Sequence, residues 1–388
     1  MKKRDDLPDV GLVAWYVGAG DSLTLLTGQE RDGAELIVQV DLNHMSLGED
    51  DQEPHVPVIR QLVEILPVVD ERPYLAAFVL THPDQDHCRG FRQLLEEEKV
   101  LIGELWMTPR IFEEYQSELC DDAIAFREEA DRRLAAIKVG ASGSGNRLRV
   151  VGRDDLFELS DLQVLPYDAR SSIGSVTTFL DGWDLEGSFE AGFHGLPDVG
   201  EDVDRNDTSL VMRVTMSAGD CAQRVLFLGD LAHDRLGSIL GGSESDELEF
   251  DVLIAPHHCS KRALFDDDGN EAGAVISGLT ANAADGAWMV ASAPPIPSSD
   301  TDGADPPHRV AWDKYSEIFG VDHQVCTGEH GSEINPDPVV FGVGHESSGY
   351  LKPSTDAAIG ASALIGAAAA ARSRPRPTDR RGYGIATQ

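Results

Sequence analysis

The sequence has few cysteines, and none of them forms a Cys-x-x-Cys pair. The five are Cys88, Cys120, Cys221, Cys259 and Cys326, scattered over 388 residues. An odd number of widely spaced cysteines does not describe a disulfide framework. The first residues carry positive charge, but the apolar stretch of a secretory signal does not follow them. We therefore expect a reducing compartment, the cytoplasm.

Long hydrophobic runs are also absent. The longest apolar stretches have the length of a strand, and the alanine-rich run 357–371 is too short and too weakly apolar to span a bilayer. Hydrophobic residues make up 41% and aromatic residues 6% of the chain, which is ordinary for a globular protein. We therefore expect no membrane-spanning segment, and the length of the chain allows a substantial core.

Basic residues are scarce. The chain has 68 acidic residues against 32 basic ones, a formal net charge of −36, and only 7 of the basic residues are lysines. Such a surface repels polyanions at long range, which disfavours nonspecific DNA binding and favours a small or locally steered substrate. An acid-rich proteome adapted to high salt would produce the same composition without any role in function.

Short apolar runs of strand length alternate with segments of helical spacing. We predict strands at 12–17, 23–26, 36–41, 74–80, 101–107, 148–151, 162–165, 208–214, 224–228, 250–255, 288–293 and 339–343, and helices at 56–69, 90–98, 111–137 and 312–319. Segment 167–206 has little regular pattern and is predicted to be a variable loop or lid insertion in a domain spanning 1–345. The Ala/Pro/Arg-rich segment 346–388 is predicted to be a disordered tail.

Potential metal ligands concentrate directly after the predicted strand 74–80. His82, Asp84, Asp86 and His87 fall within six consecutive positions. Two imidazoles and two carboxylates at this density suit zinc, manganese or iron. Any one of them alone would be typical of a solvated loop, but four together behind a buried strand predict a metal site.

Two later strands end in the same chemistry. Asp230 follows the predicted strand 224–228, and the pair His257 and His258 follows 250–255. Active sites of α/β proteins usually lie where the carboxyl ends of strands meet at one edge of a sheet. We therefore expect these residues to complete the site that begins at His82.

Six short motifs occur in a fixed order along the chain. They are VGAGDS at 17–22, HPDQDH at 82–87, NDTSLV at 206–211, FLGD at 227–230, APHHCSK at 255–261 and TGEHG at 327–331. Together they resemble the metallo-β-lactamase superfamily, and within it the hydrolase domain of ComEC-type competence proteins. Val40-Asp41 is similar to the strand-ending aspartate of that group. The resemblance covers roughly residues 10–345 and implies an α+β fold, a four-layer αββα sandwich.

The resemblance also implies a dinuclear site with one or two divalent ions per chain, zinc or manganese. Its implied ligands are His82 and Asp84 for one ion, Asp86 and His87 for the second, Asp230 as a bridge, and His257 or His258 to complete the second site. Such ions generate hydroxide from a shared water near neutral pH, so no serine or cysteine nucleophile is needed. Asp86 and Asp230 are the residues on which catalysis is expected to depend. Ser260 and Lys261 are expected to bind a substrate phosphate.

The chain departs from the family pattern at several positions. His194 is the only histidine between residues 88 and 229, and we do not expect it to be the ligand that the family usually supplies there. Cys259 stands where the family has glycine, either as a soft extra ligand or, as we favour, as a small buried residue. An alternative for Asp84 is that it does not bind the ion itself but orients a histidine that does. His308 lies in a segment that resembles the His/Pro-containing segment before the last helix of ComEC-type domains, and it is a candidate residue for lining the cleft.

These features favour a metal-dependent hydrolase, a phosphodiesterase or nuclease acting on nucleic acid or a nucleotide. One alternative is hydrolysis of a lactone or thioester, which the same hydroxide would attack. Another is a metal-stabilised component of a multi-protein system without turnover, which the missing histidine favours. The basic tail is a candidate contact for a protein partner, and the sequence leaves the oligomeric state open.

Overall fold

We describe a computed structural model of the chain. The described residues are 2–31, 34–45, 55–113, 119–141, 143–151, 189–194, 204–242, 245–332, 335–344 and 348–351.

The first of two large sheets mixes antiparallel and parallel strands. Its order is β17-β16-β1-β2-β3-β5-β6-β7, with β4 paired to β5. Pairing is antiparallel from β17 to β3 and parallel from β3 to β7. The strands are β1 (Val10–Ala14), β2 (Leu23–Arg31), β3 (Ala34–Val40), β4 (Val68–Val69), β5 (Arg72–Val79), β6 (Leu101–Met107), β7 (Arg147–Val150), β16 (Val339–Val343) and β17 (Ser348–Tyr350).

The second sheet has the order β13-β12-β11-β10-β9-β8. Strands β8, β9 and β10 pair in antiparallel fashion, and β10 to β13 run parallel. Its strands are β8 (Phe189–His194), β9 (Val211–Ala218), β10 (Cys221–Phe227), β11 (Phe250–Ile254), β12 (Ala283–Ala291) and β13 (Gln324–Cys326); a separate small hairpin consists of β14 (Gly331–Ser332) and β15 (Asn335–Pro336).

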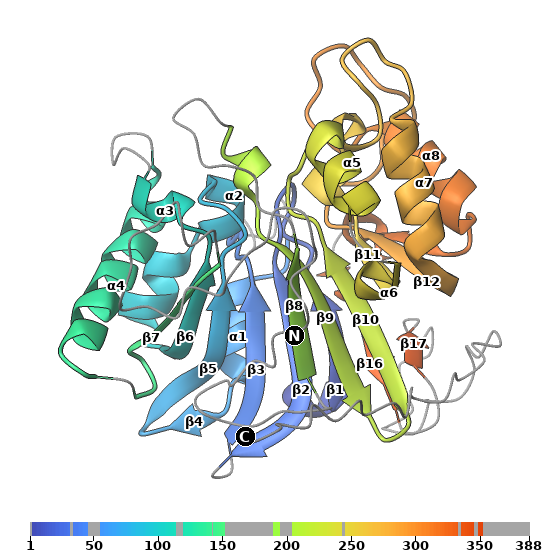
Figure 1. The fold of residues 1–388 in the computed structure, drawn as a ribbon. Helices are drawn as coiled ribbons and strands as arrows, with labels where there is room; N and C mark the ends of the chain where they lie inside the picture. The colour runs from blue at the N-terminus through green and yellow to red at the C-terminus, as the bar shows by residue number, and fades with distance from the viewer. Residues whose placement is uncertain are drawn as a thin grey trace, which may run out of the picture.

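Helices cover the outer faces of both sheets, as Figure 1 shows for α4 on one side and α7 on the other. The helices on the first sheet are α1 (Val58–Ile65), α2 (Gln85–Cys88), α3 (Arg110–Glu113) and α4 (Asp121–Lys138), with a π-helical turn at Gln93–Glu97. Those on the second sheet are α5 (His233–Gly242), α6 (Ser245–Leu248), α7 (Gly273–Asn282) and α8 (Arg309–Phe319). Short 3₁₀ turns lie at Arg4–Asp6, Asn206–Thr208 (η6), Pro256–His258 (η7), Lys261–Ala263 (η8) and Thr327–Glu329.

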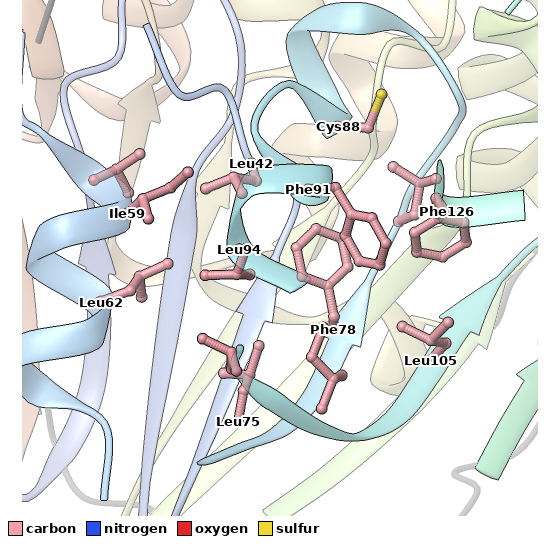
Figure 2. Close-up of a cluster of buried hydrophobic side chains, with 14 of the residues drawn as sticks. Leu42, Ile59, Leu62, Leu75, Phe78, Cys88, Phe91, Leu94, Leu105 and Phe126 are labelled. Carbon is pink, nitrogen blue, oxygen red and sulfur yellow. The ribbon is translucent and has the colours of Figure 1, made fainter. Parts of the chain in front are cut away.

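Three separate hydrophobic clusters define the layers. One lies between the two sheets and joins residues such as Val38 and Val225. A second lies between the first sheet and its helices, where Phe78 packs against Phe91 and Phe126 (Figure 2). The third lies between the second sheet and its helices. Because each sheet is buried on both faces, its central strands are apolar throughout rather than alternating. The predicted four-layer αββα sandwich is confirmed.

Most predicted strands are present, but two predicted helices differ. The predicted helix 56–69 stops at Ile65, because Pro67 disfavours helical geometry in the residue before it, and residues 68 and 69 form β4 instead. The predicted helix 111–137 consists of α3 and α4, separated by a segment that includes undescribed residues. None of the described helices is long and apolar enough to cross a membrane.

The segment 167–206 contains a strand that the sequence pattern did not predict. Residues 189–194 form β8 at the edge of the second sheet, even though the surrounding glycines and acids gave no clear alternation. Most of the remainder of that segment, the predicted strand 162–165 and the tail beyond residue 351 lie outside the described residues. The lid and the disordered tail therefore stay predictions.

The sheet topology gathers several chain segments at one edge. Strand β3 is parallel to β5, so Asp41 and the loop beginning at Thr81 follow their strands at the same edge. Antiparallel pairing of β1 with β2 and of β2 with β3 brings the loop 15–22 to that edge as well. The second sheet joins it there, where the Leu210 N–H donates to the Thr81 carbonyl oxygen at 2.8 Å.

Candidate metal centre

Asp41 organises the loop that follows β5. Its fully buried carboxylate accepts hydrogen bonds from the Thr81 N–H at 2.8 Å and the Thr81 hydroxyl at 2.6 Å. The other neighbour of this carboxylate is His87 Nδ1, 2.8 Å from Asp41 Oδ2. When a carboxylate holds Nδ1 of a histidine, Nε2 on the opposite side of the ring is the atom that is free to bind a metal ion. Asp41 thus orients His87 toward Asp230.

The Asp230 carboxylate lies at the centre of the site. It is 4% exposed, and one of its oxygens lies 3.4 Å from His87 Nε2. The other oxygen lies 3.5 Å from His258 Nε2, 3.8 Å from His257 Nε2 and 3.9 Å from His82 Nε2. Four imidazole nitrogens therefore surround a single buried carboxylate, which has two oxygens to offer to cations.

Asp230 is held by a close approach between the start of β9 and the end of β10. Gly229 has a φ of 53°, and a Cβ atom at this position would lie 2.4 Å from the Ser209 Cβ. Only glycine allows this contact, which lets the Asp230 N–H donate to Ser209 Oγ at 3.1 Å. Ser209 Oγ also lies 3.3 Å from His82 Nδ1. One serine thus positions both the central carboxylate and one of the imidazoles.

The histidine pair after β11 has an unusual backbone. His257, His258 and Cys259 have φ values of 50°, 52° and 67°, all in the left-handed region. Non-glycine residues in this region cost free energy, and such residues gather at functional sites. The His257 N–H donates to the Gly229 carbonyl oxygen at 3.0 Å, which fixes the pair against the Asp230 loop. The strained turn directs both imidazoles toward Asp230.

Asp21 is a site residue for which the sequence gave no role. It lies in the loop between β1 and β2, is 6% exposed, and has Oδ1 3.6 Å from His258 Nδ1. Asp21, His87, Asp230 and His258 present ligand atoms that all lie within 4.8 Å of one another. The sequence contains Asp21 in the motif at 17–22, but only the strand order brings this loop to the site. Because Asp21 faces Nδ1, it orients His258 as Asp41 orients His87.

Gly20 allows that loop to approach α2. It has a φ of 134°, and a Cβ atom there would lie 2.3 Å from Asn43 Nδ2 and 2.5 Å from the Asp86 carbonyl oxygen. Without a side chain at this position, the Asp21 N–H donates to the same Asp86 oxygen at 3.2 Å. The Gly20 carbonyl accepts a hydrogen bond from Ser292 Oγ at 2.7 Å, which ties the loop to the second sheet.

Several polar atoms of the site are buried without a hydrogen-bond partner among the described residues. They are His82 Nε2, His87 Nε2, both ring nitrogens of His258, Asp230 Oδ1 and Asp21 Oδ1. Buried polar atoms are nearly always satisfied in folded proteins, so a cluster of exceptions needs an explanation. A divalent cation coordinated by the Nε2 atoms and by Asp230 supplies it for those atoms, because this donor set suits zinc and similar ions. His258 Nδ1 and Asp21 Oδ1 instead face each other at 3.6 Å.

The charges of the site support the same interpretation. Burial would raise the pKa of Asp230, but His258 and His87 outweigh it and hold that pKa well below its usual value. Burial likewise opposes protonation of His87 and His258, yet the carboxylates around them, Asp230 first, raise both pKa values well above the ordinary one. A cation binding at the same Nε2 atoms must displace these protons. Burial, with a smaller effect of His87, lowers the pKa of His82 to about 3, so this imidazole is neutral and competent to bind.

The two carboxylates of the HPDQDH motif have different surroundings. Asp86 Oδ2 lies 3.3 Å from His258 Nε2, toward the centre. Burial opposes ionisation of Asp86, but His87 and His258 lower its pKa overall. Asp84 Oδ2 is 3.7 Å from His82 Nε2, whereas its Oδ1 pairs with Arg205 Nη1 at 3.1 Å. Asp84 is therefore shared between the centre and an arginine that the sequence did not single out.

The sequence-predicted ligands converge, although their roles as ligands stay predictions. The residues that lie around the centre described above are His82, Asp86, His87, Asp230, His257 and His258. His258 Nε2 lies 3.3 Å from Asp86 and 3.5 Å from Asp230, whereas His257 Nε2 lies 3.8 Å from Asp230, which favours His258 as the second-site ligand.

The expectation that His194 is not a ligand is untested. Its side chain lies outside the described residues. Its backbone, at the end of β8, pairs with Val211 at the site edge of the second sheet.

The predicted substrate-binding residues lie on the turn that follows His258. Ser260 is buried, and its Oγ accepts a hydrogen bond from the Arg262 N–H at 3.3 Å as the N-cap of η8. Lys261 is exposed. His308 supports this turn, since its N–H donates to the Cys259 carbonyl oxygen at 3.0 Å. Cys259 itself is fully buried in the cluster beneath the second sheet's helices.

Known proteins resemble this chain in structure but not in sequence. No family model matches the sequence, and no curated protein does. Among solved structures, the chain is similar to YhfI, a metallo-β-lactamase fold protein from Bacillus subtilis, at 12% identity and a TM-score of 0.36, covering 82% of this chain and 96% of that one. It is also similar to Igni18, a novel metallo hydrolase from the archaeon Ignicoccus hospitalis, at 10% identity and a TM-score of 0.35, covering 86% and 98%. Values this low assign neither a reaction nor a substrate to this chain.

Proposed function

We propose that the chain is a metal-dependent hydrolase that cleaves a phosphodiester in a nucleotide or a short nucleic acid. The observation that carries this proposal is the buried Asp230 carboxylate ringed by imidazole nitrogens, with cationic side chains on the adjoining turn. A divalent ion bound there lowers the pKa of water and offsets negative charge on a phosphoryl oxygen. The motif order supports a finer hypothesis, closeness to ComEC-type hydrolase domains.

Lys261 and Arg262 favour an anionic substrate. Both are exposed, and within the described part of the chain neither has an acidic partner at salt-bridge distance, although the whole chain has twice as many acids as bases. Both follow His258 within four residues, and the positive charge of Arg262 is the smallest of the effects, after burial, His258 and His87, that lower the pKa of His257. Cations beside a metal site attract a phosphate group and hold it there. A lactone or thioester needs no such charge.

The residues divide the work of binding and orientation. Asp41 and Asp21 hold the two imidazoles from behind, and Ser209 positions His82 and Asp230. Lys261 and Arg262 would orient the substrate anion at the open side. The Ser260 hydroxyl, which caps η8, would hold the turn that positions Lys261 and Arg262 rather than contact the substrate. No covalent nucleophile is required of the chain.

The proposal is tested with metal content and a substrate panel. We expect one or two ions of zinc or manganese per chain by elemental mass spectrometry, and turnover of bis-p-nitrophenyl phosphate and of a dinucleotide that stops on removal of the metal. Fewer than one ion would contradict the metal centre. Bound metal without turnover on phosphodiester, lactone and thioester substrates would favour a non-catalytic component, and turnover of lactones or thioesters alone would replace the phosphodiester.

A charge-removing variant separates substrate recognition from chemistry. Replacing Lys261→Gln together with Arg262→Gln should raise KM for the dinucleotide about 10-fold or more, since two charge-assisted contacts are lost. Metal content should stay unchanged. The matched control is Lys314→Gln, a lysine of α8 that pairs with Glu271 and Glu317. An unaltered KM in the double variant would remove these residues from the substrate site.

A further inference from the structure

Two thiols face each other at the end of α2, the helix that contains Asp86 and His87 of the candidate metal centre. Cys88 is the last residue of α2, and Cys120 is the N-cap of α4. Their Sγ atoms lie 3.5 Å apart, although 32 positions separate them in the sequence. Cys88 is fully buried and Cys120 is half-buried. The pair plays no part in the chemistry proposed above.

The surrounding structure holds this approach in place. The Arg92 N–H donates to Asp122 Oδ1 at 2.9 Å, which ties the chain after α2 to the first turn of α4. Beneath the thiols, the rings of Phe91 and Phe126 pack with centroids 4.9 Å apart. Figure 2 shows Cys88 above these two rings, at the margin of the hydrophobic cluster. The thiols therefore meet between packed elements.

The two sulfurs differ in reactivity. Cys120 accepts a hydrogen bond from the Ala123 N–H at 3.4 Å at the start of an 18-residue helix. The hydrogen bond with Cys88 and these backbone contacts lower the pKa of Cys120 to about 6. Helix N-termini favour thiolates, and the thiolate is the form that reacts with oxidants. The more accessible thiol of the pair is thus also the better nucleophile.

We propose that Cys88 and Cys120 form an oxidation site at which a hydroperoxide produces a reversible disulfide, and that closing this disulfide weakens metal binding. The Cys120 thiolate attacks the peroxide, the O–O bond breaks, and the leaving oxygen takes a proton from solvent as water or an alcohol. The resulting sulfenic acid is attacked by the Cys88 sulfur. The S–S bond forms, the S–O bond breaks, and the hydroxyl leaves as water with the Cys88 proton.

The coupling to the metal centre follows from the position of Cys88. Bond formation brings the sulfurs from 3.5 Å to about 2 Å, a gap that rotation of the two side chains and movement of α2 close together. Helix α2 has only four residues, and Asp86 and His87 directly precede Cys88 in it. A shift of α2 toward α4 moves His87 Nε2 relative to Asp230. Metal coordination tolerates only small displacements of the ligand atoms, so the affinity for the metal ion falls.

The experiment maps the thiols of the full-length protein after mild treatment with hydrogen peroxide. Free thiols are blocked with N-ethylmaleimide under denaturing conditions, and peptides are identified by mass spectrometry. We expect a cross-linked peptide pair containing Cys88 and Cys120 that disappears with dithiothreitol. Zinc affinity, measured by competition with a chromophoric chelator, should be about 10-fold or more weaker for the oxidised protein and recover on reduction.

Matched variants keep the two parts of the proposal separable. Cys120→Ser should abolish both the cross-link and the peroxide effect on zinc affinity, and Cys88→Ala provides the same test from the other side. Cys221→Ser, which replaces another partly exposed cysteine, should change neither. If Cys88 and Cys120 remain free thiols under conditions that oxidise Cys221, the proposed oxidation site is wrong. A cross-link with unchanged zinc affinity would overturn the coupling. The coupling rests on the proposed metal centre, whereas the formation of the cross-link does not depend on it.

Discussion

Single buried carboxylates determine the geometry of this site. Asp41 accepts the two hydrogen bonds of Thr81 and contacts His87 Nδ1, and Asp21 faces His258 on its Nδ1 side. Neither carboxylate needs to touch a metal to control one. Each determines which ring nitrogen is available, and thereby where the imidazole can bind.

Replacing Asp41→Asn should weaken zinc binding by about 10-fold to 100-fold, because the amide cannot accept all the hydrogen bonds that the carboxylate accepts and His87 loses its orientation. Chelator competition measures the affinity. Asp251→Asn, which alters an ion pair with Arg224 on β10, is the control and should bind zinc normally. Equal affinity in both variants would show that Asp41 does not position a ligand.

Metal binding should release protons. The pKa values of His87 and His258 are raised well above 6.5, chiefly by Asp230 acting against burial, so both imidazoles are protonated near neutral pH before a cation displaces the protons. Zinc affinity should therefore keep rising as the pH increases above 7, where imidazoles of ordinary pKa would already be neutral. Titration calorimetry in buffers of different ionisation enthalpy counts the protons. No release at pH 7 would mean that the two imidazoles are already neutral before the ion binds, or that they do not bind it.

At the scale of elements, glycines with positive φ set how closely the loops approach. Gly20 lets the β1–β2 loop contact α2, and Gly229 lets the end of β10 contact the start of β9. Each brings a strand-end residue to the centre. Helix α2, which contains Asp86 and His87, is itself too short to be stable alone, so its position depends on these contacts.

Gly20→Ala should therefore cost both stability and metal affinity. The added Cβ meets the Asp86 carbonyl oxygen and Asn43, and the φ of 134° is unfavourable for alanine. We expect a loss of about 1–3 kcal/mol in the free energy of unfolding, measured by urea denaturation, together with weaker zinc binding. Gly140→Ala is a matched control, since its φ is also positive, at 87°, but a Cβ there meets open space. A metal affinity in Gly20→Ala equal to that of Gly140→Ala would contradict a role for this approach.

At the scale of the whole molecule, net charge and local charge oppose each other. The chain carries −36, whereas the turn beside the candidate metal centre presents Lys261 and Arg262. A small anion experiences mainly the local cations. A long polyanion is repelled by the rest of the surface as well.

Salt should therefore raise kcat/KM for long substrates but not for short ones. For long single-stranded DNA, kcat/KM should rise as sodium chloride is raised from about 20 to 150 mM, because shorter Debye lengths screen the repulsion. For a dinucleotide it should stay level or fall. Steady-state kinetics at both salt concentrations measure this. A steep fall with salt for long DNA would instead indicate an extended cationic contact surface.

Local patterns determined much of the fold and half of the site. Apolar runs bounded by turns predict strands because central strands buried on both faces must be apolar along their whole length, and the density of ligands in 82–87 predicts a metal site. The edge strand β8 was not predicted, since glycine and acidic residues obscure its pattern. Arg205 and the Cys88–Cys120 pair gave no local signal either.

The sequence by itself determined which residue types are available for a metal: imidazoles and carboxylates placed directly after strands. Only the tertiary structure decided that Asp21 and Asp41 stand behind His258 and His87, that Asp84 faces an arginine, and that two distant thiols meet beside α2. The physical reason is that ligand types are local properties of the chain. The contacts among them depend on strand order and on how closely two sheets and their loops approach, to which residues far apart in the sequence contribute together.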